Sequence, residues 1–326
     1  MRRRIFHDWR AGLLLAAAGL LAVVMLKPYG WRERPGYPLV AVVDITRSMN
    51  TRDLRLQRTA VDRLSYVKDR LQSLLRQLPC GSRLGIGVFT ERRSTLLTMP
   101  LEVCGHFHAL QTVIDRLDWR MAWAADSRIA KGLRDAMTLM RRPELRDHAL
   151  LFFTDGHEAP PVNPRYRPDF KALRGKVTGM VVGVGGTALT PIPKFDETGR
   201  PQGFYRPEDV PHRSTFGLPA RPATDAPGYH PRNAPFGGEY VLGQEHLSSL
   251  RAAYLRTLAQ EAGLAYHTLT DAAALQAAVA HLGVREISLQ PWDGRPWWGL
   301  GAWLVLVGLY GGACWVDRYG IGERKT

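Results

Sequence analysis

The chain has 326 residues, of which 45% are hydrophobic and 23% are charged, a composition that is ordinary for a folded protein with some membrane content. Its formal net charge is +14 at pH 7. The basic residues form no long run and do not alternate with aromatic residues, so we expect no nucleic-acid partner. Scattered surface arginines and the basic flanks of apolar segments account for the charge instead.

Two apolar segments lie near the ends of the chain. Residues 11–27 are apolar or small up to the closing lysine and follow several arginines, and residues 297–316 carry no charge. About 20 apolar residues are needed to cross the hydrocarbon core of a membrane. We therefore predict a transmembrane helix at each segment. The first is slightly short, so a cleaved signal peptide is its alternative.

The basic residues beside these segments predict their orientation. Arginines before the first segment and basic residues after the second place residues 1–10 and 317–326 in the cytoplasm. An exported domain at residues 38–284, with linkers at 28–37 and 285–296, then lies on the far side of the membrane. In a bacterium this means anchoring in the inner, cytoplasmic membrane, with the domain facing the periplasm.

The exported part contains two cysteines, Cys80 and Cys104, which flank two predicted strands at residues 83–90 and 94–100. If these strands pair as antiparallel neighbours, their outer ends meet and bring the two cysteines within bridging distance. An oxidising compartment would allow a disulfide there. The alternative is two unpaired, buried thiols.

The exported part alternates predicted strands with predicted helices. We expect strands at residues 39–43, 83–90, 94–100, 149–154, 177–184 and 265–268, and helices at 52–78, 106–117, 127–140, 246–262 and 271–282. Because the strands are apolar throughout, they predict an α/β fold with a doubly wound, mostly parallel, Rossmann-like sheet and an antiparallel edge strand. Residues 187–243 are rich in Pro, Gly and Arg and are expected to form a surface insertion.

Oxygen-bearing side chains follow the ends of two predicted strands and the start of one predicted helix. In open α/β sheets such positions meet at the carboxyl edge of the sheet. Hydroxyl and carboxylate oxygens suit Mg²⁺, Mn²⁺ or Ca²⁺ rather than zinc. The pattern therefore predicts a divalent cation site formed by Asp44, Thr46, Ser48, Ser127 and Asp155, with Asp126 as an alternative to Ser127. The competing interpretation is that Asp44 and the hydroxyl groups only cap a helix.

With these residues in place, the chain resembles the von Willebrand factor A-type domains. The metal-ion-dependent adhesion site of that family reads Asp-x-Ser-x-Ser, followed by a distant Thr and a distant Asp in a Thr-Asp-Gly turn. Here Thr46 stands in the first Ser place, Ser127 in the Thr place, and Asp155 in the turn. Both changes keep an oxygen donor. The resemblance implies a metal, Mg²⁺ before Ca²⁺ or Mn²⁺, whose coordination is completed by a carboxylate of a partner protein.

Within that family the anchored layout looks most like Bat-type aerotolerance proteins and the accessory proteins of methanol dehydrogenase maturation. The sequence cues are the stretch at residues 46–54, Pro191-Ile-Pro193, and a late helical pattern at residues 255–263. This resemblance implies an assembly or metal-loading factor for an exported enzyme rather than an enzyme. It also implies partners such as a MoxR-type AAA+ ATPase and other membrane proteins of the same family.

Three other interpretations remain open. A metal-dependent hydrolase would need a general base near the cation, for which Glu158 is the obvious candidate. A general envelope-stress protein, or a structural membrane organiser with an empty site, would need no general base. The Gly183-Val-Gly-Gly-Thr-Ala188 stretch fits a dinucleotide fingerprint only loosely, because Pro191 and Pro193 follow where a helix must begin.

Overall fold

The computed structural model describes residues 9–122, 126–159, 161, 167–196, 198–210 and 243–319. The chain divides into two compact units. The larger unit is Pro35–Ile287, and the smaller one combines the two ends of the chain, Met1–Arg34 with Ser288–Thr326.

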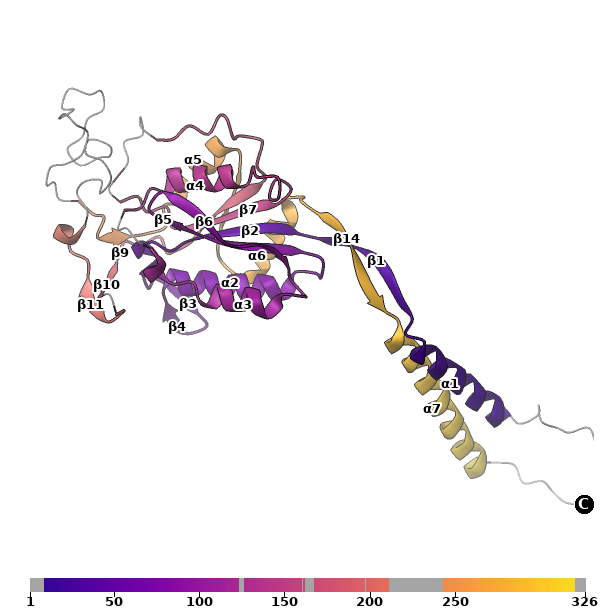
Figure 1. Ribbon diagram of the computed structural model, residues 1–326. Coiled ribbons are helices and arrows are strands. Elements are labelled where there is room, and N and C mark those ends of the chain that lie inside the picture. The colour runs from indigo at the N-terminus through magenta and orange to yellow at the C-terminus, as the bar shows by residue number, and fades with distance from the viewer. Residues whose placement is uncertain are drawn as a thin grey trace, which may run out of the picture. The chain divides into compact units, whose positions relative to one another are not determined.

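The larger unit is built around a six-stranded sheet with the order β13-β8-β7-β2-β5-β6 (Figure 1). All neighbours are parallel except β5 and β6, which are antiparallel, so the predicted α/β class and mostly parallel sheet are confirmed. The strand bounds are β2 Pro38–Asp44, β5 Arg83–Thr90, β6 Arg93–Glu102, β7 Ala149–Thr154, β8 Gly179–Gly183 and β13 Ala265–Thr268.

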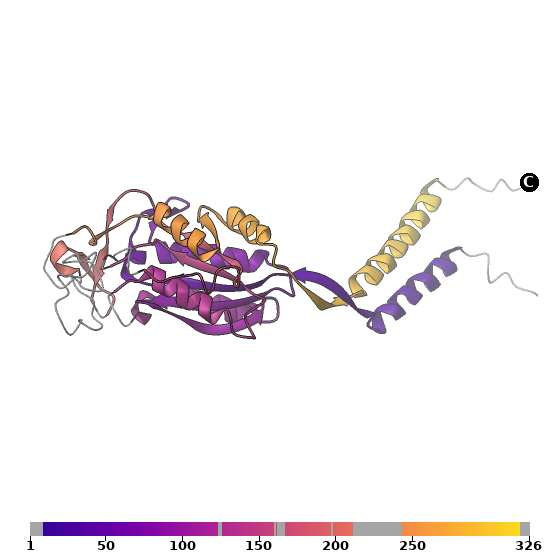
Figure 2. The same cartoon turned by 90° about the horizontal axis from the view of Figure 1, so that it is seen from above.

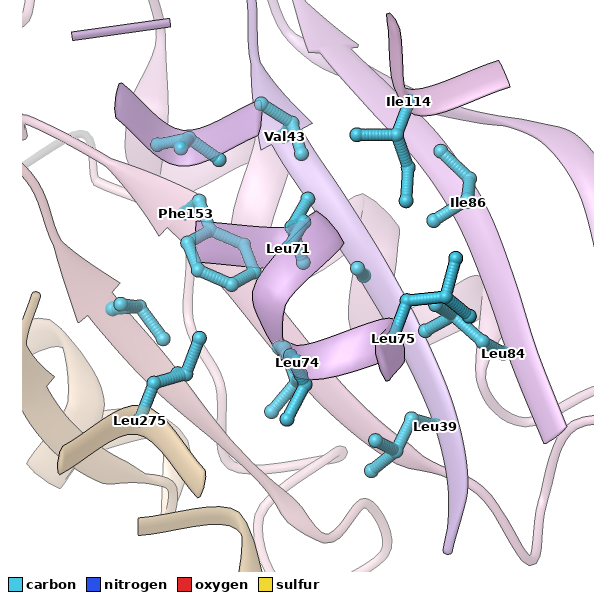
Figure 3. Close-up of a cluster of buried hydrophobic side chains, with 14 of the residues drawn as sticks. Leu39, Val43, Leu71, Leu74, Leu75, Leu84, Ile86, Ile114, Phe153 and Leu275 are labelled. Atoms are coloured by element: carbon cyan, nitrogen blue, oxygen red, sulfur yellow. The ribbon is translucent and has the colours of Figure 1, made fainter. Parts of the chain in front are cut away.

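Helices cover both faces of this sheet, as the continuous apolar strands require. On one face lie α2 (Arg63–Gln77), α3 (Phe107–Asp115) and α6 (Ala272–His281), and on the other lie α4 (Ile129–Leu139) and α5 (Ala252–Ala262). Figure 3 shows how the amphipathic helix α2 fits the first face. Its residue Leu71 lies beside Val43 of β2 and Phe153 of β7, and Leu75 lies beside Leu84 of β5, all of them buried.

The helix predicted at residues 52–78 is too long, because its first part is a small hairpin. Strands β3 (Leu54–Leu56) and β4 (Thr59–Val61) pair antiparallel, and helix α2 begins only after them. The β-branched residues of β4 favour a strand. Asp62 then starts the helix, because its Oδ1 accepts a hydrogen bond of 2.7 Å from the backbone nitrogen of Ser65.

The expected insertion contains short strands where the structure describes it. They are β9 (Thr190–Pro191), β10 (Pro193–Phe195) and β11 (Pro201–Phe204), and β9 pairs with β12 (Leu247–Ser248). Helix α5 therefore begins later than the predicted residue 246. Figure 1 places β9, β10 and β11 at the edge of the sheet where the parallel strands end. Residues 197 and 211–242 of the predicted insertion lie outside the described residues.

In the smaller unit, both predicted apolar segments are helical and both predicted linkers contain strands. Helices α1 (Trp9–Met25) and α7 (Arg295–Tyr319) lie side by side (Figures 1 and 2), and β1 (Tyr29–Gly36) pairs with β14 (Glu286–Asp293).

The prediction of two membrane spans is not supported by these helices. Among the described residues, no helix combines the length and the hydropathy needed to cross a membrane.

Candidate metal centre

The site begins where the buried strand β2 ends in Asp44. Both oxygens of this fully buried carboxylate accept hydrogen bonds, Oδ1 from the backbone nitrogen of Thr46 at 2.9 Å and Oδ2 from Thr154 Oγ1 at 2.7 Å. The chain then turns into a short 3-10 helix at Arg47–Asn50, which brings Ser48 Oγ to 3.4 Å from Thr46 Oγ1. Thr46 and Ser48, which alternate along the chain after Asp44, therefore lie close together at the tip of β2.

Ser127 reaches the same place from the segment before α4. Its backbone forms two hydrogen bonds with Ala159, at 2.8 Å and 3.0 Å, which hold it beside the turn that follows β7. The Ser127 hydroxyl is buried and has no hydrogen-bond partner among the described residues. The alternative ligand, Asp126, is also buried, with Oδ2 at 3.9 Å from Nη2 of Arg128.

Thr46, Ser48 and Ser127 line one cavity of about 30 Å³, and Asp126 does not line it. That volume has room for an ion or one to two waters. The remaining lining comes from the 3-10 helix, the turn after β7, the insertion and the segment that follows it: Arg47, His157, Ala159, Ile192, Tyr205, Val210 and Glu245. The described part of the insertion therefore forms one wall of the cavity beside the three hydroxyl groups.

Asp155, the last predicted ligand, is fully buried and already occupied by protein donors. Its Oδ1 accepts the backbone nitrogen of His157 at 2.8 Å. Its Oδ2 accepts Arg63 Nη1 at 2.5 Å and Ser248 Oγ at 3.1 Å. Three protein donors therefore occupy most of the roughly four acceptor positions of this carboxylate.

Arg63 and Asp53 are the residues that sequence reasoning missed. The guanidinium of Arg63 is fully buried, and its Nε and Nη2 reach the Asp53 carboxylate at 3.0 Å and 2.6 Å. The same carboxylate accepts the backbone nitrogen of Gly186 at 2.9 Å. Gly185 has a φ of +126°, and a Cβ on it would lie 2.7 Å from Arg63 Nε. The glycines after β8 thus make room for an arginine rather than for a pyrophosphate.

The electrostatic environment differs between the two aspartates. Burial, and then the negative charge of Asp155, raise the pKa of Asp44 to about 7. Burial also raises the pKa of Asp155. The positive charge of Arg63, and then the His157 side chain and its backbone N–H, outweigh burial and hold the pKa of Asp155 below its ordinary value. Burial lowers the pKa of His157 to about 4, so the imidazole in the cavity wall is neutral.

These residues fit a hard divalent cation. Apart from the neutral imidazole, the oxygen donors at the cavity are hydroxyl groups and the Glu245 carboxylate, beside the buried carboxylates of Asp44 and Asp155, which is the chemistry of Mg²⁺, Mn²⁺ or Ca²⁺. The Ser127 hydroxyl, which is buried and has no partner among the described residues, leaves an oxygen free to bind a cation. Capping of a helix alone would not leave this oxygen facing the cavity.

Glu158, the candidate base, does not line the cavity of the three hydroxyl groups. Its Oε1 accepts Tyr254 Oη at 2.6 Å and the backbone nitrogen of Ala130 at 3.1 Å. It borders a different cavity, with Gly156 and Arg251. Glu158 therefore anchors the first turn of α4 to α5 and does not line the hydroxyl cavity, whose lining includes the side chains of His157 and Glu245.

The two exported cysteines lie away from this edge of the sheet. A disulfide joins Cys80, which precedes β5, to Cys104, which follows β6, with 5.3 Å between their Cα atoms. The antiparallel pairing of β5 with β6 brings the outer ends of the hairpin together, and the disulfide closes them.

Comparison with known proteins agrees with the fold. Residues 39–157 match the family model of the von Willebrand factor type A domain. No curated protein sequence matches the chain. An aerotolerance-related membrane protein from Bacteroides fragilis, solved with multiple mutations to serines, superposes with a TM-score of 0.50 at 16% identity, covering 76% of this chain and 98% of the other.

Two further solved structures are more distant. BatB from Bacteroides thetaiotaomicron has a TM-score of 0.49 at 16% identity, covering 76% of this chain and 97% of the other. The manganese-loaded TRAP protein of Plasmodium vivax has a TM-score of 0.38 at 11% identity, covering 82% and 81%. At these identities the likeness concerns the fold alone.

Proposed function

We propose that this domain binds a partner protein through a divalent cation, Mg²⁺ in the first place, held by Asp44, Thr46, Ser48, Ser127 and Asp155. The observation that carries the proposal is the cavity in which three hydroxyl groups meet over two buried carboxylates, with the hydroxyl of Ser127 unpartnered among the described residues. The metal would supply an open coordination position, and a carboxylate of the partner would fill it. Glu158, the base that a hydrolase was expected to use, borders a different cavity, so binding is better supported than catalysis.

The insertion would take part in partner binding. Its residues Ile192, Tyr205 and Val210 line the cavity beside the three hydroxyl groups. A partner that places a carboxylate at the cation would therefore also contact the insertion.

For the biological role, we propose an accessory factor that assembles or metallates an exported enzyme such as a methanol dehydrogenase, with a MoxR-type AAA+ ATPase as a candidate co-partner. A general role in envelope stress is the alternative. The likeness of the fold to an aerotolerance-related membrane protein is compatible with both roles.

For the location, we propose that the chain associates with the bacterial inner membrane and that the domain faces the periplasm. The disulfide between Cys80 and Cys104 supports an oxidising compartment. Large apolar side chains on α1 and α7 support membrane association, since Leu15, Met25, Trp297 and Tyr310 are between 66% and 80% exposed.

A pull-down with purified, tagged full-length chain tests the binding function. The bait is the native chain, Asp44→Asn, or the control Asp69→Asn, which changes an exposed acid on α2. Each is incubated with envelope extract in Mg²⁺ or in EDTA. We expect one band that is recovered by the native chain and by Asp69→Asn in Mg²⁺, and that is lost in EDTA and with Asp44→Asn. Equal recovery in every arm would remove the cation from the mechanism.

A further inference from the structure

Arg63 is the largest fully buried polar side chain of the larger unit, and its guanidinium has no contact with water. It joins three segments that are far apart in the sequence. Its Nη2 donates to the Asp53 carboxylate. Its Nη1 donates to Asp155 Oδ2 at 2.5 Å and to Ser248 Oγ at 2.6 Å. A buried arginine is rare unless its charge is compensated, and here two carboxylates compensate it.

Helix formation does not explain this position. Arg63 is the first residue of α2, where the positive end of the helix dipole disfavours a cation. The surrounding chain is nevertheless shaped around the guanidinium, because Gly185 leaves space beside Nε and Gly186 donates its backbone nitrogen to Asp53. These features show a built site for one positive charge at the edge of the metal centre.

The partners of Asp155 show what this charge does. Its two oxygens accept Arg63, Ser248 and His157, and the same Arg63 Nη1 also donates to the Ser48 carbonyl oxygen at 3.5 Å. A divalent cation bound at Ser48 and the Arg63 guanidinium would therefore both be attracted to the negative charge of Asp155. Two positive charges that share one counter-charge weaken each other, and this coupling is reciprocal.

We propose that Arg63 is a built-in cation that competes with the metal for the charge of Asp155. It holds the carboxylate in its metal-binding position when no metal is present, and it lowers the affinity of the site for divalent cations. The domain would then stay ordered in both states, and metal occupancy would report on cation concentration or on a partner rather than on folding. This inference rests on the proposed function only in requiring that the site accepts a cation.

The test measures Mn²⁺ binding by isothermal titration calorimetry and melting temperature with and without EDTA, on the purified full-length chain. Arg63→Met removes the charge, and Arg76→Met is the control, because Arg76 is an exposed arginine on the same helix. We expect Arg63→Met to lower the melting temperature in EDTA by roughly 10 °C. We also expect it to tighten Mn²⁺ binding at least about fivefold and to regain part of its melting temperature in Mn²⁺. Arg76→Met should match the native chain.

A second variant gives an expectation of opposite sign and does not depend on Arg63→Met being folded. Asp53→Asn keeps an acceptor for Arg63 but leaves the guanidinium with only one carboxylate. Mn²⁺ binding should then weaken about fivefold or more. Unchanged Mn²⁺ affinity in Asp53→Asn would overturn the proposed competition. Unchanged or weaker Mn²⁺ affinity in a folded Arg63→Met would overturn it as well. In either case the partner pull-down would still decide the proposed function. Absence of Mn²⁺ binding in the native chain and in every variant overturns both.

Discussion

The two sides of the metal centre are built differently, although they meet at Ser48. On the hydroxyl side, Thr46 and Ser48 lie 3.4 Å apart at a cavity, and Ser127 has no hydrogen-bond partner among the described residues. On the carboxylate side, Asp155 and Arg63 are fully buried, and both are tied into hydrogen bonds and ion pairs. The first side is incomplete without a ligand, while the second is complete without one.

This difference teaches that binding and stability are assigned to different atoms of one site. The free energy of unfolding should depend on the carboxylate side, because breaking a buried ion pair leaves an uncompensated charge. The affinity for a cation should depend directly on the hydroxyl side, where the candidate ligand oxygens lie, and on the carboxylate side only through the charges of Arg63 and Asp155. Variants that affect one property without the other can therefore test the division.

The largest effect should come from the carboxylate side. Asp155→Asn removes the charge that faces Arg63, and we expect the free energy of unfolding in EDTA to fall by about 3 kcal/mol. Urea denaturation followed by circular dichroism measures this change. The matched control is Asp69→Asn, because Asp69 forms only an exposed ion pair with Arg70, and its cost should stay below about 1 kcal/mol. Equal losses in the two variants would contradict a structural role for Asp155.

A slightly smaller effect should come from the opposite end of the sheet. Replacing both Cys80 and Cys104 by serine removes a crosslink between residues 24 apart, and we expect a loss of about 3 kcal/mol or somewhat less. Because the crosslink precedes β5 and the metal centre lies beyond the other end of that strand, Mn²⁺ affinity should not change. Urea denaturation and calorimetry on the same sample separate the two properties. A large change in Mn²⁺ affinity would show that stability and binding are not independent.

The smallest effect on stability should come from Ser127. Ser127→Ala removes a buried hydroxyl that has no partner among the described residues, so we expect the free energy of unfolding to change by no more than about 0.5 kcal/mol. Loss of one ligand oxygen should weaken Mn²⁺ binding about tenfold, which corresponds to about 1.4 kcal/mol. Thr90→Val is the control, because its hydroxyl is also buried and unpartnered among the described residues but does not line the cavity. If both variants keep native Mn²⁺ affinity, Ser127 is not a ligand.

Much of the fold could be predicted because its patterns are local. The strands at residues 149–154 and 265–268 have the predicted bounds, and Asp271 caps α6 as its sequence position suggests, with 2.8 Å between Oδ1 and the backbone nitrogen of Ala274. The hairpin at residues 54–61 was missed, because its alternating leucines and valine also fit the period of the helix that follows. Hydrophobic spacing alone did not separate the two elements.

The site shows the same limit more sharply. The residue types of Asp44, Thr46, Ser48 and Asp155, and their places after apolar strands, are enough to predict an oxygen-rich site at the carboxyl edge of a parallel sheet, because strand direction fixes where those ends meet. Nothing in the sequence near Arg63 indicates its role. Its partner Asp155 is 92 residues away and Ser248 is 185 residues away.

The sequence by itself thus determined the class of the sheet and the chain order of its elements, and it predicted the candidate oxygen ligands, since apolar strands and the polar residues that follow them are local patterns. Only the tertiary structure decided that a buried arginine pairs with Asp155, that the insertion lines the cavity, and that Glu158 belongs to a helix contact. Those outcomes depend on which distant segments pack together, because a buried charge must be compensated by groups that the fold brings near it, and the sequence does not show which groups those are.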